Sequence, residues 1–568
     1  MEKNTLPTTK KEVQARGWDD LDVILFSGDA YIDHPSFSAA VIGRVLEAQD
    51  LRVAIVPQPD WRGDFRDFTK LGSPRLFFAI APGAMDSMIN HYTAFKRLRS
   101  DDAYTPDNRA GMRPDYPSIV YAEILKRLYP DVPVVLGGIE ASMRRLAHYD
   151  YWQDRLRPGI LADSPADLLI YGMGEKPVIE LVRLLKKGVP FHTIKNIPQT
   201  AYISEKSPDA ITLFSYEECL KDKLKQAKNF RIIEEESNKY ASSVLIQKTG
   251  NKYIIVNPSY PPASTSEIDA WYDLPYTRLP HPKYKGKSIP AYEMIKDSVT
   301  IHRGCFGGCA FCAISAHQGK FIASRSQDSI LKEIIKIKQM PNFKGYISDL
   351  GGPSANMYQM KGMDETICKR CKSPSCIYPV ICKNLSTDHS PLIELYAKAS
   401  QLPGIKKISI GSGIRYDLLL HRSENGALIR AAKQYTETLI KDHVSGRLKV
   451  APEHTEKKVL HTMRKPSFEI FENFKCLFDK INTENDLNQQ LIPYFISSHP
   501  GCTETDMAQL ALKTRKMNFH LEQVQEFTPT PMTLSTELFY TGYHPYTLEK
   551  INCPRTIPEK KAQHRYFF

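Results

Sequence analysis

The strongest constraint on the fold is a series of short apolar segments in the first third of the chain. Segments such as "DVILFSG" (22–28), "RVAIVPQP" (52–59) and "VPVVLGGIEAS" (132–142) have the length and aliphatic content of buried strands. Between the first two, "PSFSAAVIGRVLEAQ" (35–49) repeats its apolar residues with the period of a helix. Strands that alternate with helices predict an α/β domain with a parallel sheet and helices on both faces.

Glycines follow the ends of these predicted strands, at Gly28, Gly83, Gly137, Gly138, Gly172 and Gly174. In an open parallel sheet the carboxyl ends of the strands form the edge at which ligands bind. Glycine also suits the tight turns that lead from a strand into a helix. The glycines are therefore consistent with a ligand site at this edge, but for any single glycine simple turn chemistry is the favoured interpretation.

A second alternating series begins after residue 295. Its predicted strands are "SVTIHRG", "GYISDLGG", "KKISIGSGI", "RLKVAPE", "QLIPYFISSHPG" and "VQEFTPTP", with helical segments such as "SRSQDSILKEIIKIKQ" between them. These strand–helix units predict a barrel or partial barrel, which keeps its chemistry at the carboxyl ends of its strands.

The change in composition predicts four regions. We expect an N-terminal α/β domain over 1–215, a helical segment with a Pro- and Tyr-rich connector over 216–294, the barrel over 295–540 and a tail over 541–568. The connector carries many aromatic residues, so we expect it to pack along another surface. A length of 568 residues also exceeds what one core supports.

The bulk composition is that of a globular protein, with 42% hydrophobic and 25% charged residues. No apolar run is long enough to cross a bilayer, and the first residues lack an apolar leader, so we expect a cytoplasmic protein without membrane contact. The net charge of +12 is spread along the chain. A solvated basic surface is the favoured interpretation, and nucleic-acid binding is not favoured.

Seven of the 11 cysteines lie between Cys305 and Cys382, which in a cytoplasmic protein points to metal binding. The first three, in "RGCFGGCAFC" (303–312), are spaced C-x3-C-x2-C and directly follow a predicted strand. A cubane iron–sulfur cluster normally takes four thiolates, so three leave one iron open to a substrate. A zinc site with a remote fourth ligand is the alternative.

The C-x3-C-x2-C loop, with Phe311 before its last cysteine, resembles the signature of the radical S-adenosylmethionine (radical SAM) superfamily. The closer resemblance is to the YgiQ-type family of that superfamily, whose reaction is unassigned. It extends from about residue 20 to the last residues, and its motifs here are "VVLGGIEASMRR", "SRSQDSI", "TDHSPLIELY" and the segment 273–312.

This resemblance implies a fold and a set of cofactors. The fold is a cobalamin-binding-like (Rossmann-like) N-terminal domain followed by a radical SAM partial (β/α)6 TIM-like barrel. Cys305, Cys309 and Cys312 would bind a [4Fe-4S] cluster, and S-adenosylmethionine (SAM) would chelate its open iron. A low-potential electron would then cleave SAM to a 5′-deoxyadenosyl radical that acts on an unknown substrate. A donor of the flavodoxin or ferredoxin type is the implied partner.

The resemblance also assigns residues to the SAM site. Gly351 and Gly352 of "DLGGPS" match a motif whose backbone holds the methionine amino group, although Pro353 replaces the usual acid. Arg415 and Glu453, which follow the third and fourth predicted strands, are candidate contacts to SAM, with surface ion pairs as the alternative. His302 and His499 also lie at strand ends, where a structural role is the favoured interpretation.

Cobalamin is a separate question for the N-terminal domain. Cobalamin proteins that ligate cobalt from below use Asp-x-His-x-x-Gly, whereas the nearest segment here, "YIDHPSF", places Asp33 next to His34. We therefore expect no bound cobalamin.

A second cysteine group, "CKRCKSPSCIYPVIC", contains Cys368, Cys371, Cys376 and Cys382 within an insertion over 364–384. Four thiols at this spacing suffice for one zinc ion or for a second, fully ligated iron–sulfur cluster. Free thiols are the alternative.

Two other functions compete with a radical SAM enzyme of unknown substrate. One is an RNA-modifying methylthiotransferase, suggested by "LKVAPEHTEKKVLHTMRKP" and "ISSHPGCTETD". Only a short segment follows the predicted barrel, where such enzymes carry an RNA-binding domain, so this function is disfavoured. The other is a non-catalytic, metal-stabilised binding protein.

Overall fold

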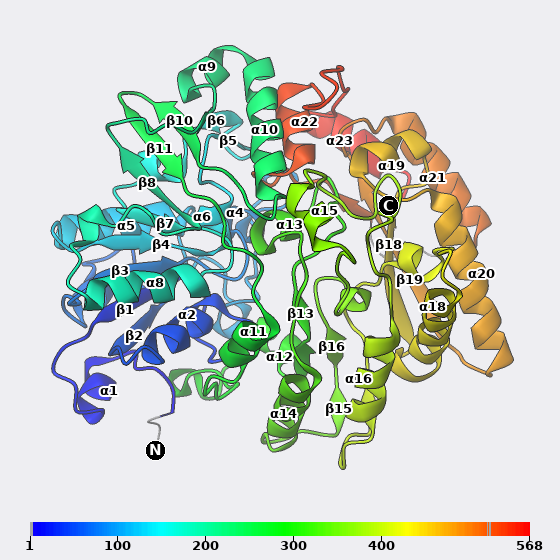
Figure 1. The fold of residues 1–568 in the computed structure, drawn as a ribbon, viewed down its shortest axis with the longest axis horizontal. Helices are drawn as coiled ribbons and strands as arrows, with labels where there is room; N and C mark the ends of the chain where they lie inside the picture. Colours follow the sequence, from blue (N-terminus) through cyan, green and yellow to red (C-terminus); the bar gives the residue numbers. More distant parts are fainter. Residues whose placement is uncertain (1–3, 520, 522–523, 568) are drawn as a thin grey trace.

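The structure is a computed structural model that describes residues 4–519, 521 and 524–567. Two α/β domains lie side by side, the N-terminal one drawn from blue to green and the second from green to orange (Figure 1). This arrangement confirms the predicted fold class.

A nine-stranded sheet forms the centre of the N-terminal domain, with strand order β2-β1-β3-β4-β7-β8-β11-β10-β9. The first five strands of this order are parallel. The order reverses at β1, which places β2 on one side and β3 on the other and opens a crevice at the carboxyl edge. The strands are β1 (Val23–Ser27), β2 (Val53–Pro57), β3 (Phe77–Ala81), β4 (Val134–Leu136), β7 (Leu168–Ile170), β8 (Thr200–Ser204), β9 (Ile211–Thr212), β10 (Leu245–Thr249) and β11 (Lys252–Val256).

Helices cover both faces of this sheet, because every central strand is apolar on both sides. On one face α2 packs against α8, and on the other α5 covers β3 and β4. The helices of this domain are α1 (Lys10–Ala15), α2 (Ser38–Glu47), α3 (Arg66–Thr69), α4 (Ser87–His91), α5 (Pro117–Leu128), α6 (Gly138–Ser142), α7 (Ile160–Asp163) and α8 (Glu175–Lys186), beside the hairpin β5 (His148–Asp150) and β6 (Arg155–Arg157).

The predicted boundary at residue 215 differs from the structure. The hairpin of β10 and β11 joins the N-terminal sheet through antiparallel pairing of β11 with β8, so this domain extends to Val256. The turn "TGN" (249–251) joins two strands whose outer residues are polar, and this polarity hid them in the sequence. The helices of the segment are α9 (Tyr216–Lys221), α10 (Lys223–Ser237), α11 (Thr265–Tyr272) and α12 (Pro290–Ile295).

The rest of the connector packs against the N-terminal domain. Tyr284, Ile289 and Tyr292 are buried in the same core cluster as β1 and β2. The hydroxyl of Tyr284 accepts a hydrogen bond from the Tyr31 amide at 3.2 Å. The aromatic residues of the connector thus fix the path of the chain between the two domains.

The second domain is a partial barrel of short parallel strands. β12 pairs with β16, β15 with β17, and β18, β19 and β20 form one sheet in this order. Its strands are β12 (Ser298–Thr300), β13 (His302–Arg303), β14 (Ala323–Ser324), β15 (Tyr346–Ile347), β16 (Asp349–Gly351), β17 (Lys407–Ile408), β18 (Arg447–Glu453), β19 (Gln490–Ser497) and β20 (Val524–Glu526).

Helices surround these strands and enclose the largest core cluster. They are α13 (Ile314–Gln318), α14 (Gln327–Lys338), α15 (Glu365–Arg370), α16 (Ser390–Ser400), α17 (Tyr416–Leu419), α18 (Gly426–Thr438), α19 (Lys457–Met463), α20 (Phe468–Glu484), α21 (Glu504–Lys516), α22 (Leu534–Thr541) and α23 (Ile557–His564). In the described part of the chain, no helix combines the length and apolar character that crossing a membrane requires.

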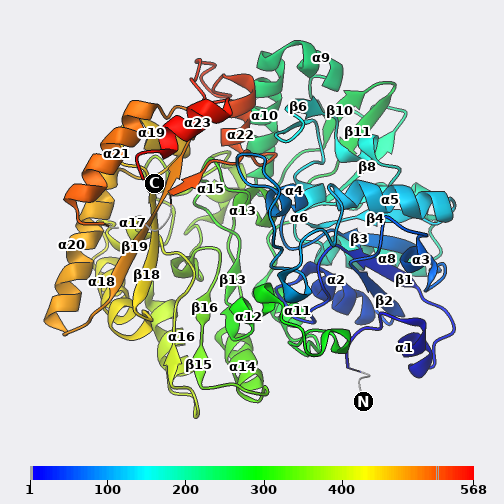
Figure 2. The same ribbon diagram turned by 180° about the vertical axis from the view of Figure 1, so that it is seen from behind.

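The last two helices tie the barrel to the N-terminal domain. α22 packs against α10, and both views show α23 on the far side of α22 at the top of the molecule (Figures 1 and 2). The fully buried amine of Lys560 donates a hydrogen bond to the Tyr151 hydroxyl at 2.7 Å. The two domains therefore share contacts at the top as well as at the connector.

Candidate functional site

A cavity of about 550 Å³ lies between the two domains, where the carboxyl edges of the two sheets face each other. From the N-terminal sheet it is lined by Gly83, Gly137, Gly138, Gly172 and Gly174. From the barrel it is lined by strand-end residues that include His302, Gly351 and Gly352. One cavity is thus lined both by the predicted SAM motif and by the strand-end glycines of the N-terminal sheet, with the exception of Gly28.

The first cysteine loop, residues 304–312, follows β13 at the barrel end of this cavity. The Cys305 amide donates to the Gly319 carbonyl at 3.1 Å, and the Ala310 amide donates to the Met463 carbonyl at 3.0 Å. The Cys312 amide donates to the Cys309 carbonyl at 3.1 Å, which closes a tight turn. Ala313 and Ile314, directly after Cys312, line the cavity.

Glycines give this loop its shape, because two of them have positive φ angles and all three meet other atoms closely. A Cβ at Gly304 would lie 2.2 Å from the Phe321 carbonyl oxygen, and one at Gly308 would lie 2.4 Å from the Pro374 carbonyl oxygen. A Cβ at Gly307 would lie 2.7 Å from Arg415 Nη1. Only glycine fits these positions, so the loop is built to present its thiols in a fixed arrangement.

The three thiols of this loop are partly buried. Burial, together with the nearby thiol of Cys309, raises the pKa of Cys305, and burial with both neighbouring thiols raises the pKa of Cys312 to about 12. Thiolates at these positions therefore require a cationic centre to balance them. Three cysteine donors on a glycine-shaped loop fit the donor set of an iron–sulfur cluster.

Arg415, at the start of α17, lies directly against this loop. Its Nη1 is 3.7 Å from the Cys309 sulfur, and its other nitrogens form a bidentate ion pair with Asp417 at 2.9 and 2.6 Å. Burial opposes its charge, but the Asp417 carboxylate and the thiols of Cys309 and Cys305 raise the pKa of Arg415. The guanidinium is thus held charged beside a sulfur, with its orientation fixed by Asp417.

Gly351 and Gly352 lie at the carboxyl end of β16. The Asp349 carboxylate accepts hydrogen bonds from the Gly411 and Ser412 amides at 2.9 and 3.1 Å, which ties this end to the next strand. A Cβ at Gly352 would lie 2.5 Å from the His302 ring. The backbone here is therefore open toward the cavity and has no room for a side chain.

His302 is fully buried and neither of its ring nitrogens has a hydrogen-bond partner among the described residues. Burial lowers the pKa of His302 to about 3, so the ring is neutral. An unsatisfied polar ring at a cavity wall is costly unless a ligand completes it. This position fits a site that is completed by a bound cofactor or substrate.

Glu453 ends β18 with a positive φ of 68° and is buried beside the first loop. Burial raises the pKa of Glu453, although the Lys465 amine, 3.6 Å away, opposes this shift. Its carboxylate also contributes to the raised pKa of Cys312. Arg415 and Glu453, predicted as cofactor contacts, are therefore both brought to the cysteine loop.

His499 has a structural environment, as the sequence favoured. Its Nδ1–H donates to the Pro500 carbonyl at 2.8 Å, and Nε2 accepts from the Ser535 hydroxyl at 2.6 Å. The ring also meets Phe311 edge to face at 6.2 Å. With both nitrogens engaged, His499 supports the cysteine loop through packing.

The sequence did not predict a buried ion pair that crosses the domain boundary. Arg303, next to the first loop, donates from Nη1 to Glu175 at the start of α8, and its guanidinium stacks 5.1 Å from the Tyr272 ring. Both residues line the cavity. Both charged residues follow predicted strands, in the segments "GMGE" and "HRG". Their pairing joins positions 128 residues apart, which only the folded structure shows.

The second cysteine group lies in the segment of α15 and the loop after it. Its thiols influence one another, because the neighbouring thiols contribute to the raised pKa values of Cys368 and Cys376, after burial. Among the described residues, no three His, Cys, Asp or Glu side chains converge tightly enough to hold a single metal ion. This applies to both cysteine groups.

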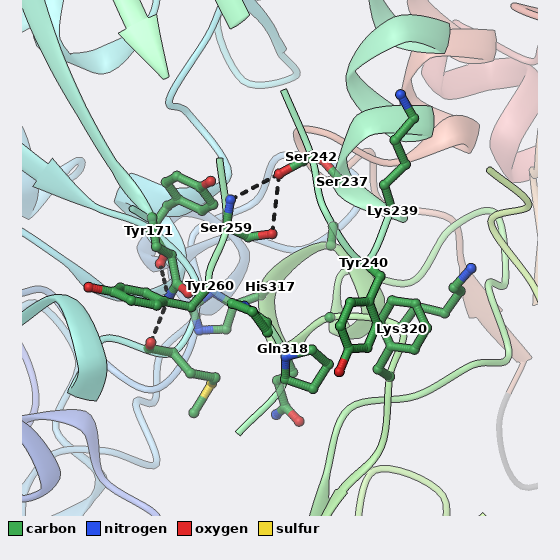
Figure 3. A pocket seen from close by; sticks show the side chains of 18 of the residues that line it. Tyr171, Ser237, Lys239, Tyr240, Ser242, Ser259, Tyr260, His317, Gln318 and Lys320 are labelled. Atoms are coloured by element: carbon green, nitrogen blue, oxygen red, sulfur yellow. Dashed lines mark hydrogen bonds between the residues drawn. The ribbon is translucent and has the colours of Figure 1, made fainter. Parts of the chain in front are cut away.

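A smaller cavity of about 150 Å³ lies beside the first, between the β10–β11 region and the segment 315–323. Figure 3 shows Tyr171 and Tyr260 on one side of it and Tyr240 and Lys320 on the other. The Ser259 amide donates to the Ser242 hydroxyl at 3.0 Å at its upper wall. Gly172, His317 and Gln318 line both cavities, so the two spaces adjoin.

Asp33 and His34 are not among the residues that line the cavity, although Pro35 and Ser36 are. Asp33 accepts from Arg44 Nε at 3.0 Å and from the Thr277 amide at 2.9 Å. His34 Nδ1 accepts from the Ser36 amide at 3.1 Å. Asp33 is thus occupied by structural contacts, and the absence of bound cobalamin stays a prediction.

Comparisons with known proteins agree with this geometry. The family model described as Radical SAM N-terminal matches residues 5–298. A UPF0313 protein of Bacteroides thetaiotaomicron is 66% identical over 99% of this chain and 93% of its own length. The UPF0313 protein YgiQ of Escherichia coli is 44% identical over 98% of this chain and 82% of its own length.

Solved structures resemble the fold at low identity. The radical SAM methyltransferase TsrM of Kitasatospora setae, solved with tryptophan and a SAM analogue, is 14% identical with a TM-score of 0.50, over 90% of this chain and 75% of that chain. The cobalamin-dependent radical SAM enzyme OxsB with aqua-cobalamin is 10% identical with a TM-score of 0.50, over 93% of this chain and 56% of that chain. On its identity to these relatives and its match to the family model, the chain belongs to the UPF0313 (YgiQ-type) family of radical SAM proteins.

Proposed function

We propose that the protein is a radical SAM enzyme whose cluster is held by Cys305, Cys309 and Cys312. The observation that carries this proposal is the loop itself: three partly buried thiols on a glycine-shaped turn, at the end of a cavity that both sheets face. When bound, a [4Fe-4S] cluster with one open iron supplies the electron that cleaves SAM to methionine and a 5′-deoxyadenosyl radical. TsrM, whose fold is similar, was solved with a SAM analogue, which supports the assignment.

The residues of the chain have distinct parts in this proposal. The backbone at Gly351 and Gly352 is open to the cavity and would receive the amino group of SAM. Arg415 places a positive charge 3.7 Å from the Cys309 sulfur, where it balances negative charge on the thiolates. Glu453, buried with the Lys465 amine 3.6 Å away, is placed to accept a hydrogen bond at the cofactor's polar end.

The cavity between the domains is the place for the substrate. Its N-terminal wall consists of strand-end backbone at the glycines after β3, β4 and β7, and its barrel wall carries the unsatisfied ring of His302. A substrate held there lies against the predicted SAM motif, which a radical that abstracts hydrogen requires.

The test is anaerobic reconstitution of the full chain with iron and sulfide, followed by dithionite and SAM. Release of 5′-deoxyadenosine, and a change in the cluster's electron paramagnetic resonance (EPR) signal on addition of SAM, are the expected results. A cluster that neither changes its signal with SAM nor releases 5′-deoxyadenosine would favour a metal-stabilised binding protein instead. Zinc alone at the three cysteines would overturn the proposal.

A further inference from the structure

The second cysteine group packs directly against the first cysteine loop, although 56 positions separate Cys312 from Cys368 in the sequence. The Cys376 amide donates to the Phe306 carbonyl at 3.0 Å, and the Ser375 hydroxyl donates to the Gly307 carbonyl at 2.8 Å. Phe306 is the residue after Cys305, so a backbone hydrogen bond joins the two cysteine segments directly.

The contact between the two groups is dry. Phe306, Met357, Met360, Ile377, Leu385 and Leu418 form a buried apolar cluster against which Cys305 and Cys376 pack. Toward the other side of the insertion, Cys382 is exposed to solvent. The second group therefore extends from the surface of the molecule to the first loop.

A buried lysine points to negative charge within the second group. Lys320 is only 1% exposed, and its amine donates to the Ser373 carbonyl at 2.8 Å and approaches the Cys371 sulfur at 3.8 Å. None of the described residues places a carboxylate within ion-pair distance of this amine. A buried ammonium without a carboxylate needs another anion, and thiolates bound to a metal provide one.

The arrangement also favours one kind of centre. Asn384 donates to the Cys368 sulfur at 3.4 Å, and a Cβ at Gly362 would lie 2.3 Å from this sulfur, so its position is fixed. Among the described residues, no three of these thiols converge on a point that one ion could occupy. The first cysteine loop has the same property. A cubane has four irons at its corners and takes its thiolates farther apart than one zinc ion does.

We propose that Cys368, Cys371, Cys376 and Cys382 bind a second [4Fe-4S] cluster, fully ligated by protein, next to the first. Its presence does not depend on the proposed function, but its role rests on that function. A low-potential one-electron carrier protein reduces the second cluster from the 2+ to the 1+ state. The same electron passes to the first cluster, which becomes 1+ while the second returns to 2+.

The first experiment measures iron, sulfide and zinc in the full-length protein, purified and reconstituted anaerobically. We expect about eight irons in the unaltered protein and about four in the triple variant Cys305→Ala/Cys309→Ala/Cys312→Ala. The triple variant carries the test, because its iron can be held only elsewhere. The exposed, isolated Cys476→Ala is the matched control and keeps about eight irons.

Several results would overturn the proposal. A folded triple variant that holds zinc, or no metal, excludes a second cluster at these cysteines. In that variant, Lys320→Gln is expected to shift the reduction potential of the remaining cluster to a more negative value, because a buried positive charge is lost. An unchanged potential would contradict the proposed position of the cluster beside Lys320.

The second experiment tests the role. The quadruple variant Cys368→Ala/Cys371→Ala/Cys376→Ala/Cys382→Ala is expected to keep dithionite-driven release of 5′-deoxyadenosine. With a reduced ferredoxin or flavodoxin as the donor, its rate of 5′-deoxyadenosine release is expected to fall at least about tenfold, because the electron can no longer pass through the second cluster. Equal loss with both donors, or no loss, excludes the relay. If this variant does not fold, Cys382→Ala at the exposed position takes its place.

The two proposals fail in different ways. If the proposed function is wrong, the unaltered protein releases no 5′-deoxyadenosine while the triple variant still binds about four irons. If only the second cluster is wrong, the unaltered protein is active with about four irons and the triple variant has none.

Discussion

The two cysteine groups differ in how the fold balances their charge. Beside the first loop, Arg415 is already paired with the Asp417 carboxylate, so its charge is satisfied before any metal is bound. Beside the second group, the Lys320 amine contacts the Ser373 carbonyl, the Cys371 sulfur and the Phe321 ring, and no carboxylate of the described residues pairs with it. The first group has three thiols and adjoins a cavity, whereas the second has four thiols and borders solvent.

This difference teaches what each group can do. Around the first group, charges are already paired and only three thiols are present. Such an environment suits a metal centre that must bind an exchangeable molecule at its open position. Beside the second group, the buried Lys320 ammonium has no carboxylate partner, and one short insertion supplies all four thiols. This arrangement suits a metal centre whose coordination is completed by the protein. The proximity of the two then matters for the transfer of electrons and not for the binding of substrate.

The largest expected effect is on activity. Cys309→Ala should reduce release of 5′-deoxyadenosine to the level of a control without protein, because the cluster loses one of its three ligands. Chromatography of the reaction products measures this. Cys476→Ala, at an exposed and isolated thiol, should release as much as the unaltered protein. Substantial release by Cys309→Ala would place the reactive cluster elsewhere, with the second group as the next candidate.

Next in size is the stability cost of removing a cation. In metal-free protein, Arg415→Met leaves the buried Asp417 carboxylate unpaired and should cost about 3–5 kcal/mol in urea unfolding. Lys320→Met leaves no carboxylate behind and should cost less than about 1 kcal/mol or stabilise. The double variant Arg415→Met/Asp417→Leu should recover much of the first loss. Equal costs for the two single variants would remove the distinction between the two groups.

The acid sensitivity of the first group is the third prediction. Because the pKa of His302 is about 3 in the folded protein and about 6.5 when unfolded, the unfolded chain binds more protons between these values. Stability should therefore fall as the pH drops, by roughly 2–3 kcal/mol between pH 7 and pH 4.5. His302→Phe should remove this part of the pH dependence in urea unfolding of metal-free protein.

The control for this experiment is His192→Gln, which changes an exposed histidine. The insertion over 364–384 contains no histidine, so the second group lacks this route to acid sensitivity. A pH profile of His302→Phe that matches that of the unaltered protein would show that the ring is not buried as described.

The smallest expected effect concerns the strand ends near the first group. Gly352→Ala would place a Cβ 2.5 Å from the His302 ring and should cost about 1–3 kcal/mol and raise the KM for SAM. Gly413→Ala, in the loop after the neighbouring strand, meets nothing within 4 Å and should change stability by less than about 0.5 kcal/mol. Similar values for both variants would argue against a close fit at the predicted SAM motif.

The sequence predicted the central strands well, because their apolar residues are buried on both faces. "DVILFSG" became β1 and "RVAIVPQP" became β2. It missed β10 and β11, whose outer residues are polar and which pair antiparallel at the edge of the sheet. Local pattern shows burial, and it does not show which distant strand a half-polar segment will join.

The site was predictable only where its residues are neighbours in sequence. The two cysteine groups stand out by spacing alone. Their contact through Cys376 and Phe306, and the pairing of Arg303 with Glu175, depend on how two domains close on each other. No sequence pattern distinguished Lys320, because the sequence does not show whether a single lysine is buried or exposed. Burial determines how strongly these charged side chains interact, and it is a property of the folded chain.

The contact between Lys560 and Tyr151 has a consequence for how the molecule is made. The amine packs on the rings of Tyr151 and Phe539, and α23 leaves the ribosome after the strands of both domains. Until then the nascent chain exposes aromatic surface that belongs inside, which invites chaperones and self-association. All seven clustered cysteines have emerged before α23, so a metal bound by them would meet two domains that this contact does not yet join.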